Sequence, residues 1–454
     1  MADLSSLPIS FADNVAYPPG YQARCIRALA EALERTPAYV AWRVCDPEPH
    51  RSIFQRLAAL PRLTKRELRD FGPQGFVPGE RNLQAALAAG KVELVNTSGT
   101  SSDQVTNVWY QPWWNACEAN SWQLNRYARA AATGSHREAI LTSPLCSGVP
   151  CEEGCLSIAE RRLGRFQFLN ERSDPRSWDD ALMARMVAEI NQYQPVLLEA
   201  NPSFLAILAR YILRNGLSVY KPALITLTYE NPSLLHYRLI KQAFGAPIAS
   251  SYGATEAGYV FMECEAGRLH QVTDNVHVDF LPFSSEHGSP QIGQILVTTL
   301  DNPWCVLLRF DIGDLVQLAA DPCPCGRRSG LTLTGIEGRT INLTLTPVGR
   351  AVSQGEVDRA LAEVAGLAEY QLTQTTATAY TLDTVADGAE PGVVVATAHD
   401  ALQTVYGPQA YIAVREVTAI APDPPGKYRL VKSLLDIDVA QFIEPRYAPK
   451  PSEG

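Results

Sequence analysis

Apolar and polar residues in the first third of the chain recur at helical spacing. Over residues 23–35 the apolar positions lie three to four residues apart, which predicts an amphipathic helix. A second helix is expected after Thr64, whose hydroxyl can cap Lys65-Arg66-Glu67-Leu68. A longer helix is expected from about Pro112 to Ala132. Each of these helices can bury only one face.

Strand and helix patterns alternate in the middle of the chain. Strands are expected at 139–142, 196–200, 224–227 and 247–250, and helices at 178–192, 202–214 and 232–244. Because the elements alternate with short connections, they predict a largely parallel sheet covered on both faces. From Val276 to Leu333 the pattern changes to short strands separated by Pro, Asn and Gly, which predicts a β-rich subdomain within residues 264–335.

The remainder of the chain carries a smaller set of elements, a helix at 354–365 and strands near 370–373 and 392–397. We therefore expect an α/β large N-terminal domain that contains the β-rich subdomain, followed by a small α+β C-terminal domain of ordinary domain size. The expected limits are 1–338 for the large domain, 339–342 for a hinge and 343–454 for the small domain.

Composition excludes several classes of function. The chain has 46% hydrophobic and 19% charged residues, as globular proteins do. With a net charge of −9 and no block of Lys and Arg, it is not expected to bind nucleic acid. No apolar run approaches the roughly 20 residues of a membrane span, and the N-terminus lacks the features of a signal peptide. Ten cysteines spread irregularly over a long chain are typical of a reducing compartment, so we expect a cytoplasmic protein.

The segment Lys91–Thr106 is a short strand that runs into small hydroxyl residues around one glycine. Backbone N–H groups and hydroxyls that converge at such a turn can donate to phosphate oxygens, and the glycine allows close approach of a ligand. The Walker spacing is absent, and a polar surface turn is the alternative for this stretch alone. The candidate phosphate ligands are Thr97, Ser98, Gly99, Thr100 and Ser101.

Three thiols and one imidazole form a second candidate site. Cys264 and His270 are six residues apart, and Cys323 and Cys325 follow later. A Cys₃His set suits tetrahedral Zn²⁺, although the spacing is unlike that of a zinc finger. Four unligated residues are the alternative. Cys146, Cys151 and Cys155 lack a fourth ligand, and we interpret them as packing or as a pocket wall.

Several short motifs resemble those of the acyl-adenylate-forming (AMP-binding) superfamily, and they occur in that superfamily's order. The first is the Thr97-Ser98-Gly99-Thr100-Ser101-Ser102 loop. The others are Ser251-Tyr252-Gly253-Ala254-Thr255-Glu256-Ala257-Gly258, Arg309-Phe310-Asp311-Ile312-Gly313-Asp314-Leu315, Gly338-Arg339-Thr340 and Pro425-Gly426-Lys427-Tyr428-Arg429. The phrase Leu60–Arg69 is similar to the N-terminal signature of the phenylacetate–CoA ligase branch, some of whose members resemble this chain in the Cys/His spacing.

The resemblance implies a role for each motif. Tyr252 and Gly253 would hold adenine, Thr255 a phosphate, and Glu256 Mg²⁺, which prefers oxygen ligands. Asp314 would bind the ribose hydroxyls, and Arg339 would approach the ribose or a phosphate. Lys427, at the tip of a Pro-Pro-Gly loop on a mobile C-terminal lid, would bridge the substrate carboxylate and the α-phosphate of ATP.

The resemblance also places an acyl pocket. Its walls would be Tyr229, Glu230, Ser251 and the loop Cys146-Ser147-Gly148, with the helix after the phosphate loop as a third wall. That helix region carries Trp109, Tyr110, Trp113, Trp114 and Trp122, and some of the tryptophans are expected in the core. Because flat rings favour flat ligands through offset stacking, we expect an aromatic or compact carboxylic acid and not a long-chain fatty acid.

The expected function is ATP-dependent conversion of a carboxylic acid to acyl-AMP, followed by transfer to a thiol. The thiol would be coenzyme A or the phosphopantetheine of a carrier protein; transfer to an amine and a non-catalytic nucleotide- or acyl-binding relative are the alternatives. The sequence departs from the superfamily pattern at Asp103, at Asp311-Ile312 and at Asn342, and the departures at Asp103, Ile312 and Asn342 motivate the last of these alternatives. The residues leave the acid, the acceptor and a homodimer open.

Overall fold

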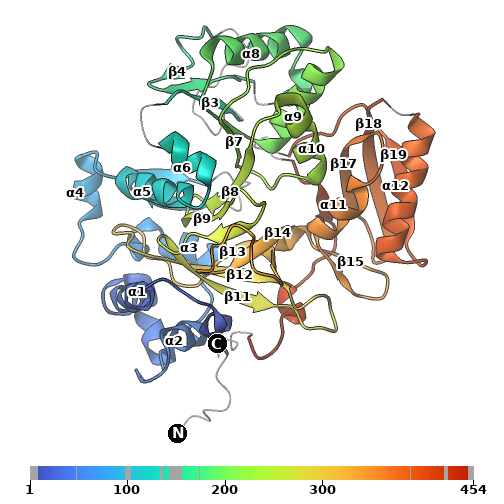
Figure 1. Ribbon diagram of the computed structural model, residues 1–454. Helices are drawn as coiled ribbons and strands as arrows, with labels where there is room; N and C mark the ends of the chain where they lie inside the picture. Colours follow the sequence, from blue (N-terminus) through green and yellow to red (C-terminus); the bar gives the residue numbers. More distant parts are fainter. Residues whose placement is uncertain are drawn as a thin grey trace. The chain divides into compact units, whose positions relative to one another are not determined.

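The chain forms two compact units, each assembled from segments that are distant in the sequence (Figure 1). The first unit comprises Met1–Leu124, Gly253–Thr340 and Asp438–Gly454, and the second comprises Asn125–Tyr252 and Ile341–Ile437. The computed structural model describes residues 9–47, 49–97, 104–132, 136–142, 156–172, 174–388, 390–423 and 428–447 of them.

The first unit is built on antiparallel strands in the order β11-β12-β13-β14-β10-β9. Their bounds are β9 (Gly258–Glu263), β10 (Leu269–Gln271), β11 (Val276–Pro282), β12 (Ile292–Thr299), β13 (Phe310–Leu318) and β14 (Thr332–Arg339). Every residue of β11 is buried. The β-rich region is therefore confirmed, although β13 has nine residues and is longer than the short strands expected.

Helices and a hairpin complete the first unit. The helices are α1 (Tyr21–Arg35), α2 (Ile53–Ala59), α3 (Lys65–Phe71), α4 (Leu83–Ala88) and α5 (Gln111–Trp122), and the hairpin strands are β1 (Glu93–Asn96) and β2 (Thr106–Trp109). The predicted cap of α3 is confirmed. The Thr64 hydroxyl accepts from the Glu67 N–H at 3.3 Å while the Glu67 carboxylate accepts from the Thr64 N–H at 2.7 Å.

The second unit contains the predicted parallel sheet. Strands β8, β7, β6, β3 and β5 are parallel neighbours in that order, and β4 pairs antiparallel with β5. Their bounds are β3 (Glu138–Leu141), β4 (Arg162–Leu163), β5 (Phe166–Phe168), β6 (Leu197–Ala200), β7 (Leu224–Leu227) and β8 (Ile248–Ala254). The helices are α6 (Arg126–Ala132), α8 (Asp180–Tyr193), α9 (Pro202–Arg214) and α10 (Leu234–Phe244), and α8, α9 and α10 bury apolar faces in one core with these strands.

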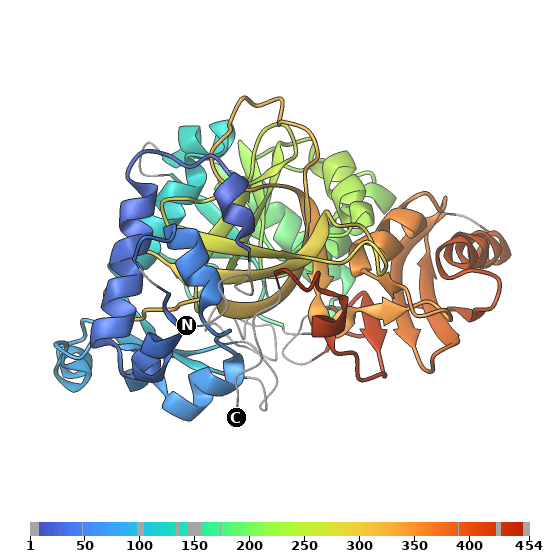
Figure 2. The same cartoon turned by 90° about the horizontal axis from the view of Figure 1, so that it is seen from below.

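The C-terminal segment of the second unit forms its own four-stranded sheet, in the order β19-β18-β17-β20. Its elements are β15 (Thr344–Leu345), β16 (Ala351–Val352), α11 (Gln354–Ala362), β17 (Leu367–Gln374), β18 (Ala379–Ala386), α12 (Pro391–Tyr406), β19 (Tyr411–Glu416) and β20 (Val431–Ser433). Figure 2 shows α12 against the outside of this sheet.

Two sequence predictions of local structure are wrong. The strand expected at 392–397 is the start of α12, because β18 and β19 are parallel and need a crossover helix between them. Val394, Ala398 and Leu402, four residues apart, are the buried face of that helix. The single helix expected over 112–132 is two helices, because the Asn125 side chain caps α6 by accepting from the Tyr127 and Ala128 N–H groups.

The chain passes from one unit to the other between Thr340 and Ile341, inside the predicted hinge. These two units are groups of residues that pack together. The predicted limits of the large domain, the hinge and the small domain describe which segments move as one body, so those limits stay a prediction. Among the described residues, no helix combines the length and the apolar composition that crossing a bilayer requires.

Candidate active site and metal centre

The predicted phosphate loop lies between the strands of the β1–β2 hairpin, which pair from Glu93↔Trp109 to Asn96↔Thr106. Thr97 closes the base of the loop. Its N–H donates to the Val105 carbonyl at 2.9 Å, and its hydroxyl accepts from the Val105 N–H at 3.0 Å. The hairpin therefore holds Thr97 in place. Ser98, Gly99, Thr100, Ser101 and the unusual Asp103 lie outside the part of the chain that the structure describes.

Glu256 of the second motif is buried in the turn between β8 and β9, with 5% of its surface exposed. The Lys65 ammonium at the start of α3 lies 3.7 Å from its Oε1. Within the described residues, this Oε1 has no hydrogen-bond partner. A buried carboxylate oxygen in this state can be satisfied by a cation. Sequence reasoning missed Lys65, because nothing in the spacing links residue 65 to residue 256.

The residues before Glu256 are held by close backbone packing. A Cβ atom at Gly253 would lie 2.4 Å from the Gly258 carbonyl oxygen, so only glycine allows β8 and β9 to approach here. Ser251 is buried, and Tyr252 and Thr255 are half-buried. The second motif is therefore a tight turn that presents its polar side chains from a rigid strand end.

Asp314 and Arg339, both predicted to reach the nucleotide, lie directly opposite each other on β13 and β14. The Arg339 Nε lies 3.5 Å from Asp314 Oδ1. The Arg339 side chain is half exposed, and that of Asp314 is 15% exposed. Gly313, next to Asp314, has φ of +83°, a backbone conformation that favours glycine. Strand register thus brings together two residues that the sequence separates.

Asp311, one of the departures from the superfamily pattern, has a structural explanation. Arg62 lies 3.2 Å from one of its carboxylate oxygens, and the Gln294 amide donates to the other at 2.8 Å. The same carboxylate accepts from the Gly313 N–H at 3.0 Å. Asp311 therefore ties the start of β13 to two other segments of the first unit. Its neighbour Ile312 is a core residue with 3% exposed.

The predicted pocket residues Tyr229 and Glu230 follow β7 in the second unit. Tyr229 has φ of +72°, a strained backbone conformation for a residue with a side chain. Its hydroxyl donates to the Glu199 carboxylate. The Glu230 carboxylate accepts from the Ser203 hydroxyl at 2.8 Å and from the Tyr428 N–H at 2.8 Å. Cys146, Ser147 and Gly148 lie outside the described residues.

Lys427 also lies outside the described residues, but its surroundings on the C-terminal segment are visible. Lys432, on β20, lies 3.1 Å from Asp423 and so pairs within the segment. Asn342, at the predicted hinge, is buried, and its amide donates to the Gln354 side chain at the start of α11 at 3.3 Å. The asparagine that departs from the superfamily pattern therefore anchors a helix.

The tryptophans near α5 pack within the first unit. The Trp113 indole donates to the Leu300 carbonyl at 3.4 Å, and its ring lies against Gly258. Trp114 contacts Trp109 and Tyr259, with ring centres 4.2 Å and 5.1 Å away. Trp122 is buried. These rings have packing partners of their own, as the sequence analysis expected for some of them.

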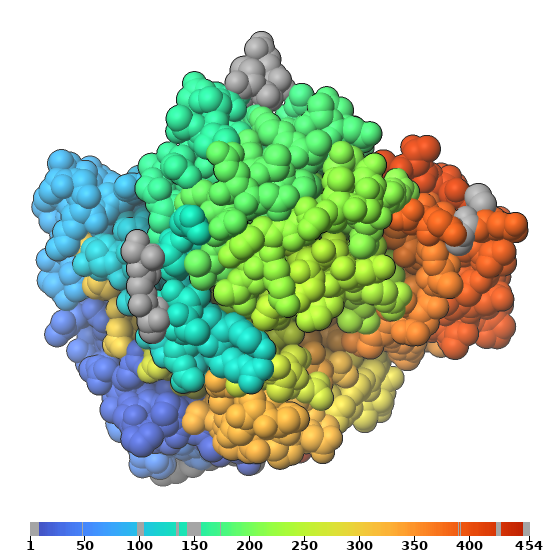
Figure 3. Space-filling model, turned by 45° about the horizontal axis from the view of Figure 1, so that its top comes forward, coloured from blue at the N-terminus to red at the C-terminus, as the bar shows by residue number. Residues whose placement is uncertain are grey.

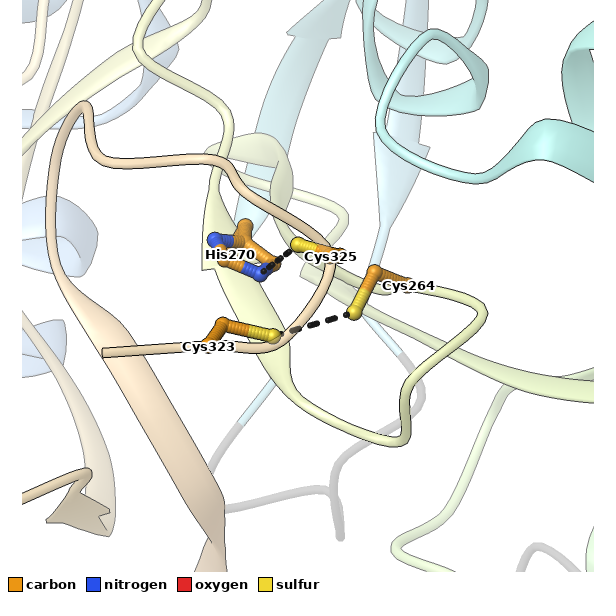
Figure 4. A group of neighbouring side chains, drawn as sticks. All are labelled: Cys264, His270, Cys323 and Cys325. Atoms are coloured by element: carbon orange, nitrogen blue, oxygen red, sulfur yellow. Dashed lines mark hydrogen bonds between the residues drawn. The ribbon is translucent and has the colours of Figure 1, made fainter. Parts of the chain in front are cut away.

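Cys264, His270, Cys323 and Cys325 come together in the first unit, as Figure 4 shows. Cys264 follows β9, His270 lies on β10, and the other two cysteines lie in the loop between β13 and β14. One ligand atom from each residue lies within 4.8 Å of the others. The Cys264 and Cys323 sulfurs are 3.6 Å apart, and the Cys325 sulfur is 3.3 Å from His270 Nε2.

These distances fit a tetrahedral zinc site. With Zn–S of about 2.3 Å and Zn–N of about 2.05 Å, tetrahedral angles place two sulfurs about 3.8 Å apart and a sulfur and nitrogen about 3.5 Å apart. Burial lowers the pKa of His270 to about 4, so the imidazole is neutral at pH 7, as a metal ligand must be. Its other nitrogen, Nδ1, lies 3.3 Å from the Thr332 hydroxyl, which can orient the ring.

No protein-family model matches the chain. A stretch of 133 residues is 29% identical to Protein CapK of Staphylococcus aureus, and it covers 29% of this chain and 28% of that protein. The chain therefore matches less than a third of the length of this curated relative.

Solved structures match over much more of the chain. A 2-hydroxyisobutyryl-CoA ligase in the postadenylation state, in complex with 2-HIB-AMP, is similar over 96% of this chain and 92% of its own, with a TM-score of 0.68 and 18% identity. The same ligase with 2-HIB-AMP and CoA in its thioesterification state covers 95% and 94%, with a TM-score of 0.55 and 18% identity. The anthranilate CoA ligase AuaEII with anthranoyl-AMP covers 74% and 64%, with a TM-score of 0.52 and 13% identity.

The two-unit architecture, the order of the motifs and the similarity to these ligases all indicate the same fold. The chain has the fold of the acyl-adenylate-forming ligases.

Proposed function

We propose that this protein uses ATP to convert a carboxylic acid to acyl-AMP and then transfers the acyl group to a thiol. The observation that carries the proposal is the likeness, over 96% of the chain, to a ligase whose complex holds an acyl-AMP. The phenylacetate–CoA ligase branch is proposed from the Leu60–Arg69 signature. A non-catalytic relative of the same fold is the alternative.

The residue roles follow from the placement of the motifs. Asp314 and Arg339 face each other on neighbouring strands, where a carboxylate can accept from ribose hydroxyls and a guanidinium can donate to ribose or phosphate. Glu256 would hold Mg²⁺, because its buried Oε1 makes no hydrogen bond among the described residues and can coordinate a cation. Tyr252 and Gly253 would hold adenine, and Thr255 and the Thr97–Ser101 loop would donate to the phosphates.

For the acid, we propose an aromatic or compact substrate. Tyr229 follows β7, where the pocket is expected, and its hydroxyl donates to the Glu199 carboxylate, which restrains the ring. The structural relatives act on a compact acid and on an aromatic acid, respectively. A bulky, fixed ring at this point would exclude a long aliphatic chain.

For the acceptor, we propose coenzyme A, with a carrier-protein phosphopantetheine or an amine as alternatives. Two of the relatives are CoA ligases, and one of them was captured with CoA. We also propose that the protein works in a reducing compartment, the cytoplasm. The described cysteines are free thiols.

For the Cys₃His cluster, we propose one structural Zn²⁺ per chain. Four protein ligands would close the coordination shell and leave no position for a substrate. The ion would join the loop between β13 and β14 to the β9–β10 turn and would take no part in the chemistry.

Substrate-dependent exchange of pyrophosphate into ATP tests the function directly, because it reports adenylate formation alone. Wild-type protein should exchange with at least one acid in a panel of benzoic, arylacetic, heteroaryl, small hydroxy and long-chain fatty acids, and the long chains should fail. Lys427→Ala should lower the exchange rate on the order of 10²–10³, by analogy with the loss of a preorganised transition-state donor.

Lys432→Ala is the matched control, because this lysine is paired with Asp423 on the same segment. It should leave exchange near the wild-type rate. Lack of exchange with every acid would favour the non-catalytic alternative. Wild-type exchange in Lys427→Ala would show that the lysine has been assigned a wrong role.

A further inference from the structure

Glu230 joins the predicted acyl-pocket loop to the C-terminal segment. Both of its carboxylate oxygens are engaged: Oε2 accepts from the Ser203 hydroxyl at 2.8 Å, and Oε1 accepts from the Tyr428 N–H at 2.8 Å. Ser203 lies at the start of α9 and is 5% exposed. Tyr428 is the residue after Lys427 in the sequence. A pocket residue thus holds the chain next to the predicted catalytic lysine.

The tyrosine side chain strengthens this contact. Its ring meets Phe204 edge to face, with the ring centres 6.4 Å apart, and it packs against the core formed by α8, α9 and α10. Burial raises the pKa of the Tyr428 hydroxyl above its ordinary range, so the ring stays neutral and remains suited to an apolar site. The Tyr428 ring therefore holds the same residue on the core by an apolar contact, in addition to the backbone bond to Glu230.

Further contacts hold the C-terminal segment on α9 and α10. Arg210 pairs with Glu369 at 2.9 Å, and the Leu234 N–H at the start of α10 donates to the Asp358 carboxylate of α11 at 2.8 Å. The Arg238 guanidinium donates to the Ala362 carbonyl at 2.7 Å. In the space-filling view the green surface of α9 and α10 runs directly into the orange surface of this segment (Figure 3).

These last three contacts are an ion pair and hydrogen bonds, and they lie beside an apolar contact in which Leu235 of α10 packs into the core of the C-terminal segment. A polar interface of this kind separates more readily than an apolar interface of the same area, because water can replace each partner of its hydrogen bonds and ion pairs. The carboxylate of Glu230 has the same charge as an acid substrate, so it would repel the substrate carboxylate and not bind it. These two facts fit a residue that docks and releases a segment better than one that binds the acid.

We propose that Glu230 is a positioning residue. Its hydrogen bond to Tyr428 holds the C-terminal segment in place for adenylate formation and breaks to release the segment for acyl transfer. The proposal rests on the proposed function. In the docked arrangement, the Glu230–Tyr428 bond fixes the backbone one residue from Lys427, about 3.8 Å between Cα atoms. Loss of the bond would therefore slow the first half-reaction and spare the second.

The test compares Glu230→Gln with wild-type protein in each half-reaction. Glutamine keeps the size but offers one acceptor oxygen, so it can serve only one of the two donors without loss. Loss of a hydrogen bond to a charged group typically lowers a rate by about tenfold to hundredfold when the bond is needed in the transition state. The rate of pyrophosphate exchange should therefore fall by about that factor. Transfer to CoA from chemically made acyl-AMP should stay within about twofold, and the KM for the acid should not change.

Two variants serve as controls. Ser203→Ala removes one donor to Glu230 and leaves Tyr428 in place, so it should lower exchange less than Glu230→Gln does. Asp383→Asn breaks the Arg415–Asp383 pair between β18 and β19 of the same segment, in which the arginine is largely exposed, and should change neither half-reaction. A raised KM for the acid, or an equal loss in both half-reactions, would overturn the docking role.

Amide hydrogen exchange gives a readout that does not depend on activity. In Glu230→Gln, peptides covering residues 428–437 should exchange faster than in the wild type, while peptides from β18 should not. If wild-type protein exchanges no pyrophosphate with any acid, the proposed function fails. Unchanged exchange at 428–437 in the variant would instead show that Glu230 does not hold the segment, whether or not the enzyme is active.

Discussion

The Cys₃His cluster of the first unit and the Glu230 contact of the second unit both hold distant segments together, but they do so by different chemistry. Each connects two stretches of chain that are far apart in the sequence, residues 264–270 to 323–325 in one case and Glu230 to Tyr428 in the other. In the cluster, ligand atoms from four side chains converge within 4.8 Å, and three of the four residues are buried. At Glu230, one carboxylate accepts two hydrogen bonds, one from the Ser203 hydroxyl and one from the Tyr428 N–H.

The difference shows how a fold separates permanent from releasable connections. A closed zinc site gives up its ligands only when the metal leaves, and its binding free energy adds directly to folding. Two hydrogen bonds can be replaced by water at a net cost of about 1 to 3 kcal/mol. We therefore expect the β-rich part of the first unit to stay assembled while the C-terminal segment docks and releases.

Removing one of the proposed zinc ligands should have the largest effect. Cys323→Ser should lose the metal and, because a structural zinc contributes several kcal/mol to folding, should lower the Tm by about 10 °C or more. Cys45→Ser, at a half-exposed thiol outside the cluster, should keep about one Zn per chain and the wild-type Tm. Elemental analysis and thermal unfolding of the same samples give both values. Fully stable, thiol-reduced wild-type protein without zinc would contradict the site.

Breaking the Arg210–Glu369 pair should have the next largest effect. Both side chains are at least 86% buried, and burial raises the pKa of Glu369 despite the nearby Arg210, so the ionised pair carries a desolvation cost. Glu369→Leu leaves Arg210 buried without its partner and should cost about 3 kcal/mol in denaturant unfolding. The double variant Arg210→Met/Glu369→Leu should regain most of this loss.

The control for that pair is Arg415→Gln, which removes one side of the exposed pair with Asp383 and should cost less than about 1 kcal/mol. A loss in Arg415→Gln as large as in Glu369→Leu would mean that burial does not distinguish the two pairs. No recovery in the double variant would mean that Glu369 acts through contacts other than Arg210.

Acid should weaken the second unit through His236, a smaller effect. Burial lowers the pKa of this α10 histidine to about 4, with help from the Arg210 charge, and its Nδ1 has no hydrogen-bond partner in the described part of the chain. Because the unfolded chain binds the proton near pH 6.5 and the folded chain does not, stability is lost as pH falls from about 6.5 toward 4. The loss should reach about 2 kcal/mol at pH 5.

His236→Leu removes the titrating group and should flatten the Tm profile between pH 6.5 and pH 4.5. The control is His399→Gln on the exposed side of α12, which should keep the wild-type slope. An unchanged slope in His236→Leu would show that another group governs the acid sensitivity of this unit.

Local signals in the sequence were sufficient for much of the fold. The helix cap at Thr64, the helix Pro202–Arg214 and the strand Leu224–Leu227 were predicted at or within a residue of their observed limits. Their signals are short-range: a cap, a helical period and a β-branched run all act within a few residues. The four residues of the Cys₃His cluster were predicted from residue type, because three thiols and one imidazole suit Zn²⁺, although 59 residues separate Cys264 from Cys323.

Tertiary structure decided the features that depend on a partner distant in the sequence. Residues 392–397 form a helix because β18 and β19 are parallel, and Asp311 is tolerated because Arg62 and Gln294 lie beside it. Glu230 meets Tyr428, and Glu256 meets Lys65, across separations of 198 and 191 residues. Periodicity reports which face of an element is buried but not which side chain it is buried against. Polar contacts over such distances arise only when the whole unit has packed.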